Sequence, residues 1–259
     1  MAKAFIALLF VLSSITLAQS FGQNKVQYRE FDWDFISSPN FDVYYYGDEI
    51  ELATFTMEAA NDAYEQIGKH LRWNLKKRVP IIVYHSHNEF QQNNAVGVYM
   101  SEGIGGVTEL FKNRVVIPFE GDYKAFRHVI HHELVHAMIN DLIYGGRMQN
   151  VASGQVNWSI PLWANEGLAE YLSSNWDTEA DMIIRDLAIN ERIPTVRELE
   201  YYLAYKGGQS VWKFIASKYG REKIGEVFQS MKTMRSAEKG FKNAIGMDYD
   251  ELTEQWHKY

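Results

Sequence analysis

Apolar residues recur along the chain at two spacings, and each change of spacing marks a new predicted element. Between residues 29 and 47 they alternate with other residues, as at Phe41, Val43 and Tyr45, which predicts a strand or hairpin. From residue 51 to residue 70 they recur every three or four positions, which is typical of an amphipathic helix. Strands are also expected at 79–84, 95–100 and 113–119, and helices at 176–190, 196–204, 209–219, 222–231, 237–245 and 250–259.

The apolar spacing between residues 122 and 143 predicts a helix with Asp122 as its N-cap, ended by two glycines. This helix carries His132-Glu133-Leu134-Val135-His136. Histidines four residues apart lie on the same side of a helix, so both imidazoles can reach one zinc ion at about 2.0–2.1 Å. Glu133 can hold and deprotonate the water that the ion activates, as in the H-E-x-x-H pattern of zinc proteases. The alternative is two surface histidines on an ordinary helix.

A second predicted helix, beginning at Pro161, supplies further carboxylates. Glu166 and Glu170 are four residues apart within Asn165-Glu166-Gly167-Leu168-Ala169-Glu170. One of them can be the third zinc ligand, while the other supports a ligating histidine through a hydrogen bond. The spacing alone does not say which is which, and a solvated acidic stripe is the alternative.

These two motifs together resemble the gluzincin metallopeptidases, which combine HExxH with a downstream NEGxxE-type helix. The resemblance implies that Glu166 is the third ligand and that Glu170 supports a histidine. More closely, the chain resembles the peptidase MA-like domains of bacterial envelope proteins, often found ahead of a TolB-like β-propeller. The likeness begins near Phe31 and is strongest over 103–171. The gap between the two helices, residues 144–160, is longer than in thermolysin and aminopeptidase N relatives.

The fold class that we predict is α+β of the zincin type. A small twisted mixed sheet would form an N-terminal lobe, about 23–143, and helices a C-terminal lobe, about 144–259, with the zinc cleft between them. In the resembled peptidases the strand before the zinc helix is an edge strand that pairs with extended substrate. Here the segment 106–116 is placed to do so.

Two further site residues are expected from the resemblance to aminopeptidase N relatives. Tyr205, in Tyr205-Lys206-Gly207-Gly208, is the candidate for stabilising the oxyanion of the tetrahedral intermediate. Only the adjoining glycines distinguish it from Tyr201 and Tyr202, and the alternative for all three is aromatic packing. Glu109 occupies the place of a glutamate that holds a free substrate amine in those relatives. The alternative for Glu109 is a solvated glutamate at the end of a strand.

The N-terminal residues and the composition indicate where the protein is located and which partners it binds. Residues 1–22 combine Lys3 with a short apolar run, which predicts a signal peptide cleaved after Ala18 or Gly22. The chain has no cysteine, which excludes a lipoprotein anchor, disulfides and thiolate zinc ligands. No later segment resembles a transmembrane span. The net charge of −7 argues against nucleic acid as the main partner.

Four other histidines are not expected to bind the metal. His85 and His87 form an alternating pair without an acidic or cysteine partner nearby in sequence. His128 and His131 are taken as ordinary residues of the zinc helix, because neither is placed to close the fourth zinc position.

The predicted function is therefore that of a periplasmic or secreted zinc metallopeptidase with one zinc per chain, acting on peptide or protein substrates. The alternatives are a non-catalytic zinc-containing binding or scaffold module of the envelope, and an aminopeptidase. The C-terminal helix resembles the point where relatives continue, which leaves room for a further envelope domain or partner.

Overall fold

The computed structural model describes residues 25, 27–94, 100–110, 112–145 and 158–259. The predicted signal peptide at 1–22 lies outside the described residues. So do most of the strand expected at 95–100 and most of the segment 144–160.

Within the described residues, five strands form one mixed sheet in the order β1-β2-β3-β5-β4. Their bounds are β1 (Trp33–Ser37), β2 (Phe41–Tyr46), β3 (Val79–Tyr84), β4 (Val107–Glu109) and β5 (Arg114–Pro118). β1 and β2 form an antiparallel hairpin, β2, β3 and β5 run parallel, and β4 returns antiparallel to β5. The predicted hairpin and the strands expected at 79–84 and 113–119 are confirmed, and the edge position falls to the short β4.

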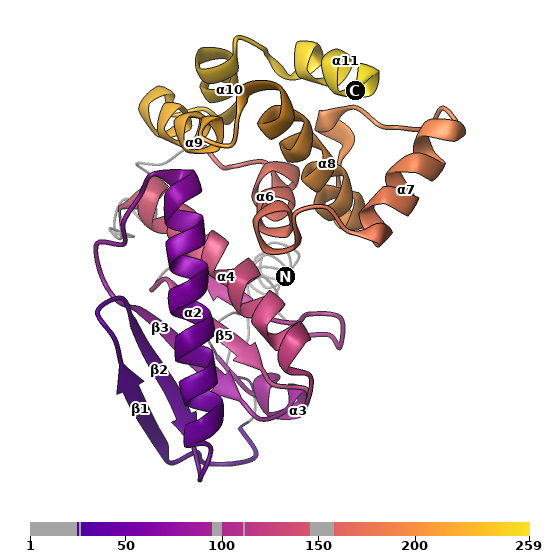
Figure 1. Cartoon of the computed structure of the whole chain (residues 1–259). Coiled ribbons are helices and arrows are strands. Elements are labelled where there is room, and N and C mark those ends of the chain that lie inside the picture. Colours follow the sequence, from indigo (N-terminus) through magenta and orange to yellow (C-terminus); the bar gives the residue numbers. More distant parts are fainter. Residues whose placement is uncertain (1–24, 26, 95–99, 111, 146–157) are drawn as a thin grey trace, which may run out of the picture.

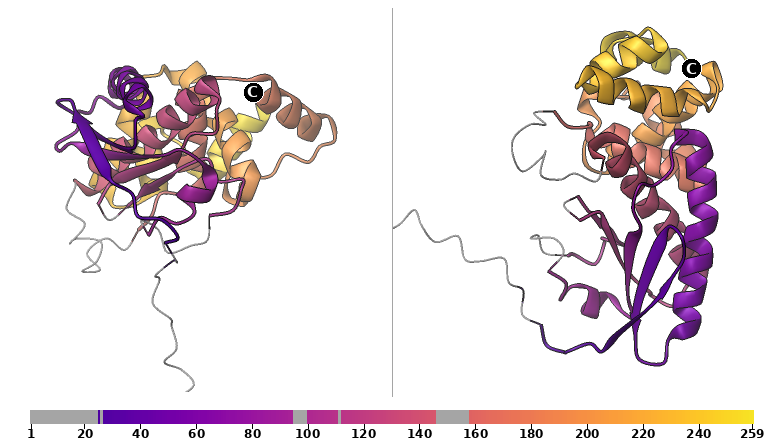
Figure 2. Two further views of the ribbon diagram at one scale, coloured as in Figure 1. Left: turned by 90° about the horizontal axis from the view of Figure 1, so that it is seen from below. Right: turned by 90° about the vertical axis from the view of Figure 1, so that its left-hand side faces the viewer.

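One face of the sheet is covered by two long helices, α2 (Ile50–Leu71) and α4 (Tyr123–Tyr144) (Figures 1 and 2). Alternate strand residues such as Phe41, Ile81 and Ile117 are fully buried in the core that these helices share. Each such side chain contributes about 1.5–3 kcal/mol through its removal from water. The alternation read from the sequence therefore sets which face of the sheet receives the helices.

The opposite face of the sheet carries a smaller aromatic cluster that contains Tyr46, Tyr84, Phe90 and Val116. Phe90 comes from the single turn α3 (His87–Phe90), which follows β3.

α4 has the boundaries that its sequence predicts. The side chain of Asp122 accepts hydrogen bonds from the backbone amides of Lys124 and Ala125, and a cap of this kind stabilises a helix by about 1 kcal/mol. At the other end Gly145 adopts a left-handed conformation with φ 65°. Ile130 and Leu134 are fully buried, which orients α4 and fixes the direction of its histidines.

The described residues from 158 onward form helices, and the first of these helices packs against α4 (Figure 1). Its elements are α6 (Leu162–Ser174), α7 (Thr178–Ile189), a 3-10 turn (Val196–Glu198), α8 (Tyr201–Tyr219), α9 (Lys223–Met234), α10 (Ala237–Ile245) and α11 (Tyr249–Lys258). The prediction of separate helices at 196–204 and 209–219 is wrong, because α8 is continuous through Gly207 and Gly208.

These glycines do not break α8 because α6 lies directly against them. A Cβ on Gly208 would lie 2.1 Å from the carbonyl oxygen of Trp163, and a Cβ on Gly167 would lie 2.3 Å from the carbonyl carbon of Gly208. The two helices therefore touch backbone to backbone, and the indole of Trp212 donates to the carbonyl oxygen of Ala164 (2.9 Å). Packing thus outweighs the low helix propensity of glycine.

The five-stranded sheet and the helices together confirm the α+β prediction and are consistent with a zincin-like fold. Among the described helices, none has both the length and the apolar character needed to cross a membrane.

Candidate metal centre

Two histidines of α4 and one glutamate of α6 point their ligand atoms at one another. Nε2 of His132 and Nε2 of His136 are 3.2 Å apart. Oε2 of Glu166 lies 3.3 Å from the first and 3.2 Å from the second. Among the residues that the structure describes, this is one of two groups able to hold a metal ion.

The geometry of this triangle fits a zinc ion. Ligands at about 2.0–2.1 Å around a tetrahedral ion lie about 3.3–3.4 Å from one another, close to the three observed separations. Two imidazoles and a carboxylate are also a donor set that zinc accepts, with the fourth position left for water in catalytic sites. His132, His136 and Glu166 are thus the residues that would hold the ion.

Glu170 lies behind His132, on the side away from the triangle. Its Oε1 is 3.1 Å from Nδ1 of His132, and its Oε2 accepts a hydrogen bond from Nζ of Lys206 (2.8 Å). Lys206 also lies within 3.4 Å of Asp177 and 3.2 Å of Glu179. Because Nδ1 of His132 is engaged by Glu170, its Nε2 is left to face the triangle.

The charges of this centre depend strongly on one another. Burial opposes protonation of His132, yet Glu166 and Glu170 raise its pKa to about 10. Burial also opposes ionisation of Glu170, but hydrogen bonds from His132 and Lys206 lower its pKa to about 2. Without a metal, Glu166 and Glu170 therefore stay ionised in this buried site, with His132 and Lys206 as the neighbouring cations that balance them.

Glu133 lies next to the triangle and is held by the edge strand. The hydroxyl of Thr108 lies 2.7 Å from Oε2 of Glu133 and 2.9 Å from its backbone oxygen. A Cβ on Gly106 would lie 3.0 Å from Cγ and 3.1 Å from Oε1 of the same glutamate. The carboxylate thus sits directly against the backbone of the strand segment 106–108.

Tyr205 projects from α8 toward the same place. Its ring is nearly parallel to that of His132, with centroids 6.1 Å apart and an interplanar angle of 16°. Burial, then the charges of Glu166 and Glu133, raise the pKa of its phenol. Tyr205 is therefore a neutral hydrogen-bond donor across the physiological pH range. Tyr201 is largely exposed, and Tyr202 donates to Glu179 (2.8 Å).

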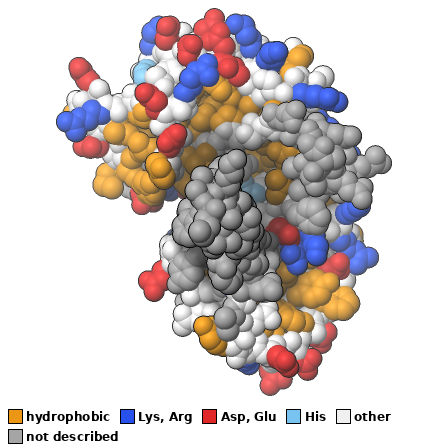
Figure 3. Space-filling view, turned by 180° about the vertical axis from the view of Figure 1, so that it is seen from behind, with side chains coloured by type: hydrophobic (Ala, Val, Ile, Leu, Met, Phe, Trp, Pro, Cys, Tyr) orange, Lys and Arg blue, Asp and Glu red, His pale blue; other side chains and the backbone are white. Residues whose placement is uncertain are grey.

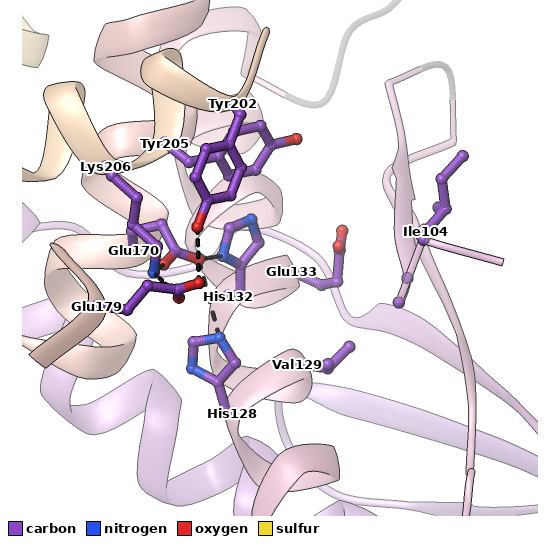
Figure 4. A pocket seen from close by; sticks show the side chains of 13 residues that line it. Ile104, His128, Val129, His132, Glu133, Glu170, Glu179, Tyr202, Tyr205 and Lys206 are labelled. Atoms are coloured by element: carbon purple, nitrogen blue, oxygen red, sulfur yellow. Dashed lines mark hydrogen bonds and ion pairs between the residues drawn. The ribbon is translucent and has the colours of Figure 1, made fainter. Parts of the chain in front are cut away.

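Two adjoining cavities open on either side of this centre, of about 540 and 450 Å³, and both are lined by His132, Glu133 and Tyr205. The first lies between Ile104 and Val129 on one side and the polar side chains of α6, α7 and α8 on the other (Figure 4). Seen from behind, a histidine is visible in the hollow between the two halves of the molecule (Figure 3). A bound peptide could therefore extend from the metal triangle into both cavities.

Some residues that the sequence singled out lie elsewhere. The carboxylate of Glu109 pairs with Arg114 at 2.5 Å across the β4–β5 ladder, and Glu109 lines neither cavity. Its expected role as an amine-binding residue receives no support from this position. Nδ1 of His87 is 3.7 Å from Glu120, and neither His85 nor His87 belongs to a metal-holding group of described residues.

Sequence reasoning missed several residues of the site. His128, taken as an ordinary helix residue, lines the larger cavity with its Nε2 3.8 Å from Glu170, and its group with His132 and Glu170 is the second that could hold a metal. Its position one turn before His132 on α4 was a usable signal. Thr108 and Lys206 were also missed, and only the adjacency of Lys206 to Tyr205 pointed to it.

The comparisons with known proteins agree with this geometry. No curated protein matches the chain. The family model of the peptidase MA superfamily matches residues 59–259, which contain the metal triangle, Glu133, Glu170 and Tyr205. Members of that superfamily are metallopeptidase-like and typically depend on a metal. A match over most of its length shows that the chain belongs to the peptidase MA superfamily.

Proposed function

We propose that this chain is a zinc-dependent peptidase that hydrolyses peptide bonds with Glu133 as general base. The observation that carries the proposal is the convergence of His132, His136 and Glu166 to a triangle with edges of 3.2–3.3 Å beside Glu133. A zinc ion held there would polarise the scissile carbonyl and lower the pKa of water to about 7.

The chain's own residues supply the remaining steps. Oε2 of Glu133 is engaged by Thr108, which leaves Oε1 to take the proton of the attacking water and to pass it on to the leaving amine. The phenol of Tyr205 donates to the carbonyl oxygen as negative charge develops on it. The outer edge of β4 offers backbone groups that align an extended peptide along the two cavities.

The arrangement supports turnover over the alternative of a structural zinc site. A structural site normally fills the fourth position with a protein ligand. Among the described residues only three ligand atoms converge, and the glutamate next to them lines both cavities.

The decisive experiment compares wild type with Glu133→Gln, which keeps the shape of the side chain and removes the base. We expect about one zinc per chain in both proteins, and turnover of a quenched fluorescent peptide library lower by about 10²-fold or more in the variant. Loss of zinc from Glu133→Gln would show that this residue is a ligand. Equal inactivity of both proteins on every peptide would favour the scaffold alternative.

We also infer that the protein acts outside the cytoplasm, in the periplasm or as a secreted protein. The support is the charged and apolar pattern of residues 1–22, which lie outside the described residues. N-terminal sequencing of the protein recovered from a cell's periplasm or medium tests this inference. It should begin just after Ala18 or Gly22, whereas protein found only in the cytoplasmic fraction and starting at Met1 would contradict export.

A further inference from the structure

Thr108 occupies the middle of the edge strand β4 and faces α4 rather than solvent. Its hydroxyl oxygen lies 2.7 Å from Oε2 of Glu133, well inside the range of a hydrogen bond between a hydroxyl and a carboxylate. Among the described residues, this is the one hydrogen bond recorded for the carboxylate of Glu133. We propose that Thr108 is a positioning residue that holds Glu133 in the orientation needed for proton transfer. This inference rests on the proposed function.

The surroundings of Glu133 make a positioning group necessary. Glutamate has three rotatable side-chain bonds, and an unrestrained carboxylate in a cavity would populate several rotamers. Gly106 limits the carboxylate on one side, because Cγ and Oε1 lie 3.0 and 3.1 Å from where its Cβ would be. Gly106 restricts space but forms no bond, so the direction of the carboxylate is set by the hydroxyl of Thr108.

Gly106 directly precedes β4 and meets Glu133 from the same side as Thr108. Residues two apart in a strand point to the same side, so the glycine and the hydroxyl meet the glutamate together. β5 anchors β4 through the pairing of Thr108 with Val115, and Val115 is fully buried. The position of the hydroxyl is therefore fixed by the sheet and not by a loop.

The second acceptor near Thr108 suits a base whose charge changes during the reaction. The backbone oxygen of Glu133 lies 2.9 Å from the same hydroxyl, which has only one proton to donate. When Glu133 is ionised, its carboxylate is the stronger acceptor and attracts the proton. When Glu133 is neutral, the hydroxyl of Thr108 can rotate and donate to the backbone oxygen. The hydroxyl therefore has an acceptor whether Glu133 is ionised or neutral.

The test uses Thr108→Val, which keeps the shape of the side chain and removes the hydroxyl, and Thr108→Ser, which restores the hydroxyl. Thr56→Val is the control, because Thr56 is a threonine away from the site whose hydroxyl also donates to a backbone oxygen, that of Leu52 in α2 (2.8 Å). Loss of a hydrogen bond to a charged group in the transition state corresponds to a fall in the rate constant of about tenfold to hundredfold. We expect kcat of Thr108→Val to fall by that factor on a peptide from the library, with KM and zinc content within about twofold.

Thr108→Ser should recover most of the lost kcat, and Thr56→Val should leave kcat and KM unchanged. If Thr108→Val keeps the kcat of wild type while Glu133→Gln is inactive, the positioning role is wrong and the proposed function stands. A fall in kcat that Thr108→Ser does not restore would likewise overturn it.

A second measurement does not depend on activity. Melting temperatures of the metal-free wild type, Thr108→Val, Glu133→Leu and the double variant form a double-mutant cycle, because leucine, unlike glutamine, cannot accept a hydrogen bond from the hydroxyl. A hydrogen bond between the two side chains makes the two shifts in melting temperature non-additive, because either change already breaks the bond. Additive shifts would overturn the inference, even if no peptide is cleaved and the proposed function itself fails.

Discussion

Close contacts at glycines, one between β4 and α4 and one between α6 and α8, help to place glutamates at the candidate metal centre. The two contacts do so in different ways. At the β4–α4 contact, Gly106, which directly precedes the three-residue edge strand β4, lies against the side chain of Glu133. At the α6–α8 contact, Gly167 and Gly208 bring two helix backbones together, and Glu166 and Glu170 project from that contact. The first contact adjusts one side chain, whereas the second sets the distance between two helices.

The comparison shows how the two sides of the site divide their tasks. Damage to the α6–α8 contact moves the backbone that carries Glu166 and Glu170, so it should reduce both stability and metal binding. Damage to the β4–α4 contact changes only the orientation of Glu133, the proposed base, so it should reduce turnover while the metal stays bound. Gly208→Ala tests the α6–α8 side of this division, and Thr108→Val tests the β4–α4 side.

The largest effect is expected from Gly208→Ala. The added methyl would lie 2.1 Å from the carbonyl oxygen of Trp163, which is backbone and cannot move without shifting α6. We expect a loss of about 3 kcal/mol or more in the free energy of unfolding, measured by urea denaturation, together with reduced zinc binding. Gly103→Ala is the control, because nothing lies within 4 Å of its Cβ, and it should change stability by less than about 0.5 kcal/mol. Equal stability of both variants would contradict the close helix contact.

The next largest effect separates the two glutamates of α6. Glu166→Ala removes an atom of the triangle, whereas Glu170→Ala removes a partner of His132. Loss of an outer partner typically weakens metal binding by about 10–100-fold, and loss of a ligand should weaken it well beyond that. Competition with a fluorescent zinc chelator measures both affinities. A weaker affinity in Glu170→Ala than in Glu166→Ala would reverse the assignment.

Tyr205→Phe should lower kcat by about 10²-fold, because in the proposed mechanism the phenol donates to the developing oxyanion. Zinc content, melting temperature and KM should change little, since the ring itself is kept. Steady-state kinetics on the peptide used for Glu133→Gln checks this. The control is Tyr201→Phe, because Tyr201 is 84% exposed and lines neither cavity. A fall in melting temperature with kcat unchanged would mean that Tyr205 only packs.

The smallest effect is expected for the pH dependence of stability at Tyr84, which lies on the face of the sheet opposite to α2 and α4. Burial raises the pKa of Tyr84 to about 12 from its usual value near about 10. The folded protein thus keeps the proton longer than the unfolded chain, so this contribution to stability is present below about pH 10 and is lost as the pH rises toward 12. In metal-free protein, wild type should lose about 1 kcal/mol more than Tyr84→Phe between pH 9 and pH 11 in urea denaturation. The same loss in both proteins would contradict a buried, neutral Tyr84.

Most elements could be predicted because their signals are local. The strand 79–84 and the helix 237–245 have the predicted bounds, and Asp122 caps α4 as expected. The prediction failed at Gly207 and Gly208, where low helix propensity suggested a boundary. Nothing local in the sequence says that the backbone of α6 lies against these two residues, and that contact is what keeps them helical.

The sequence by itself determined that His132 and His136 face the same side of one helix, because a helix places residues four apart on one side whatever surrounds it. It also indicated a second helix with two carboxylates, but their spacing left both roles open, and the resemblance was needed to favour Glu166. Only the tertiary structure placed Oε2 of Glu166 within 3.3 Å of both imidazoles, turned Glu170 to the other side of His132, and brought Thr108 and Lys206 to the site. These contacts join residues between 25 and 38 positions apart along the chain, and their partners are chosen by the packing of helices and sheet rather than by local spacing.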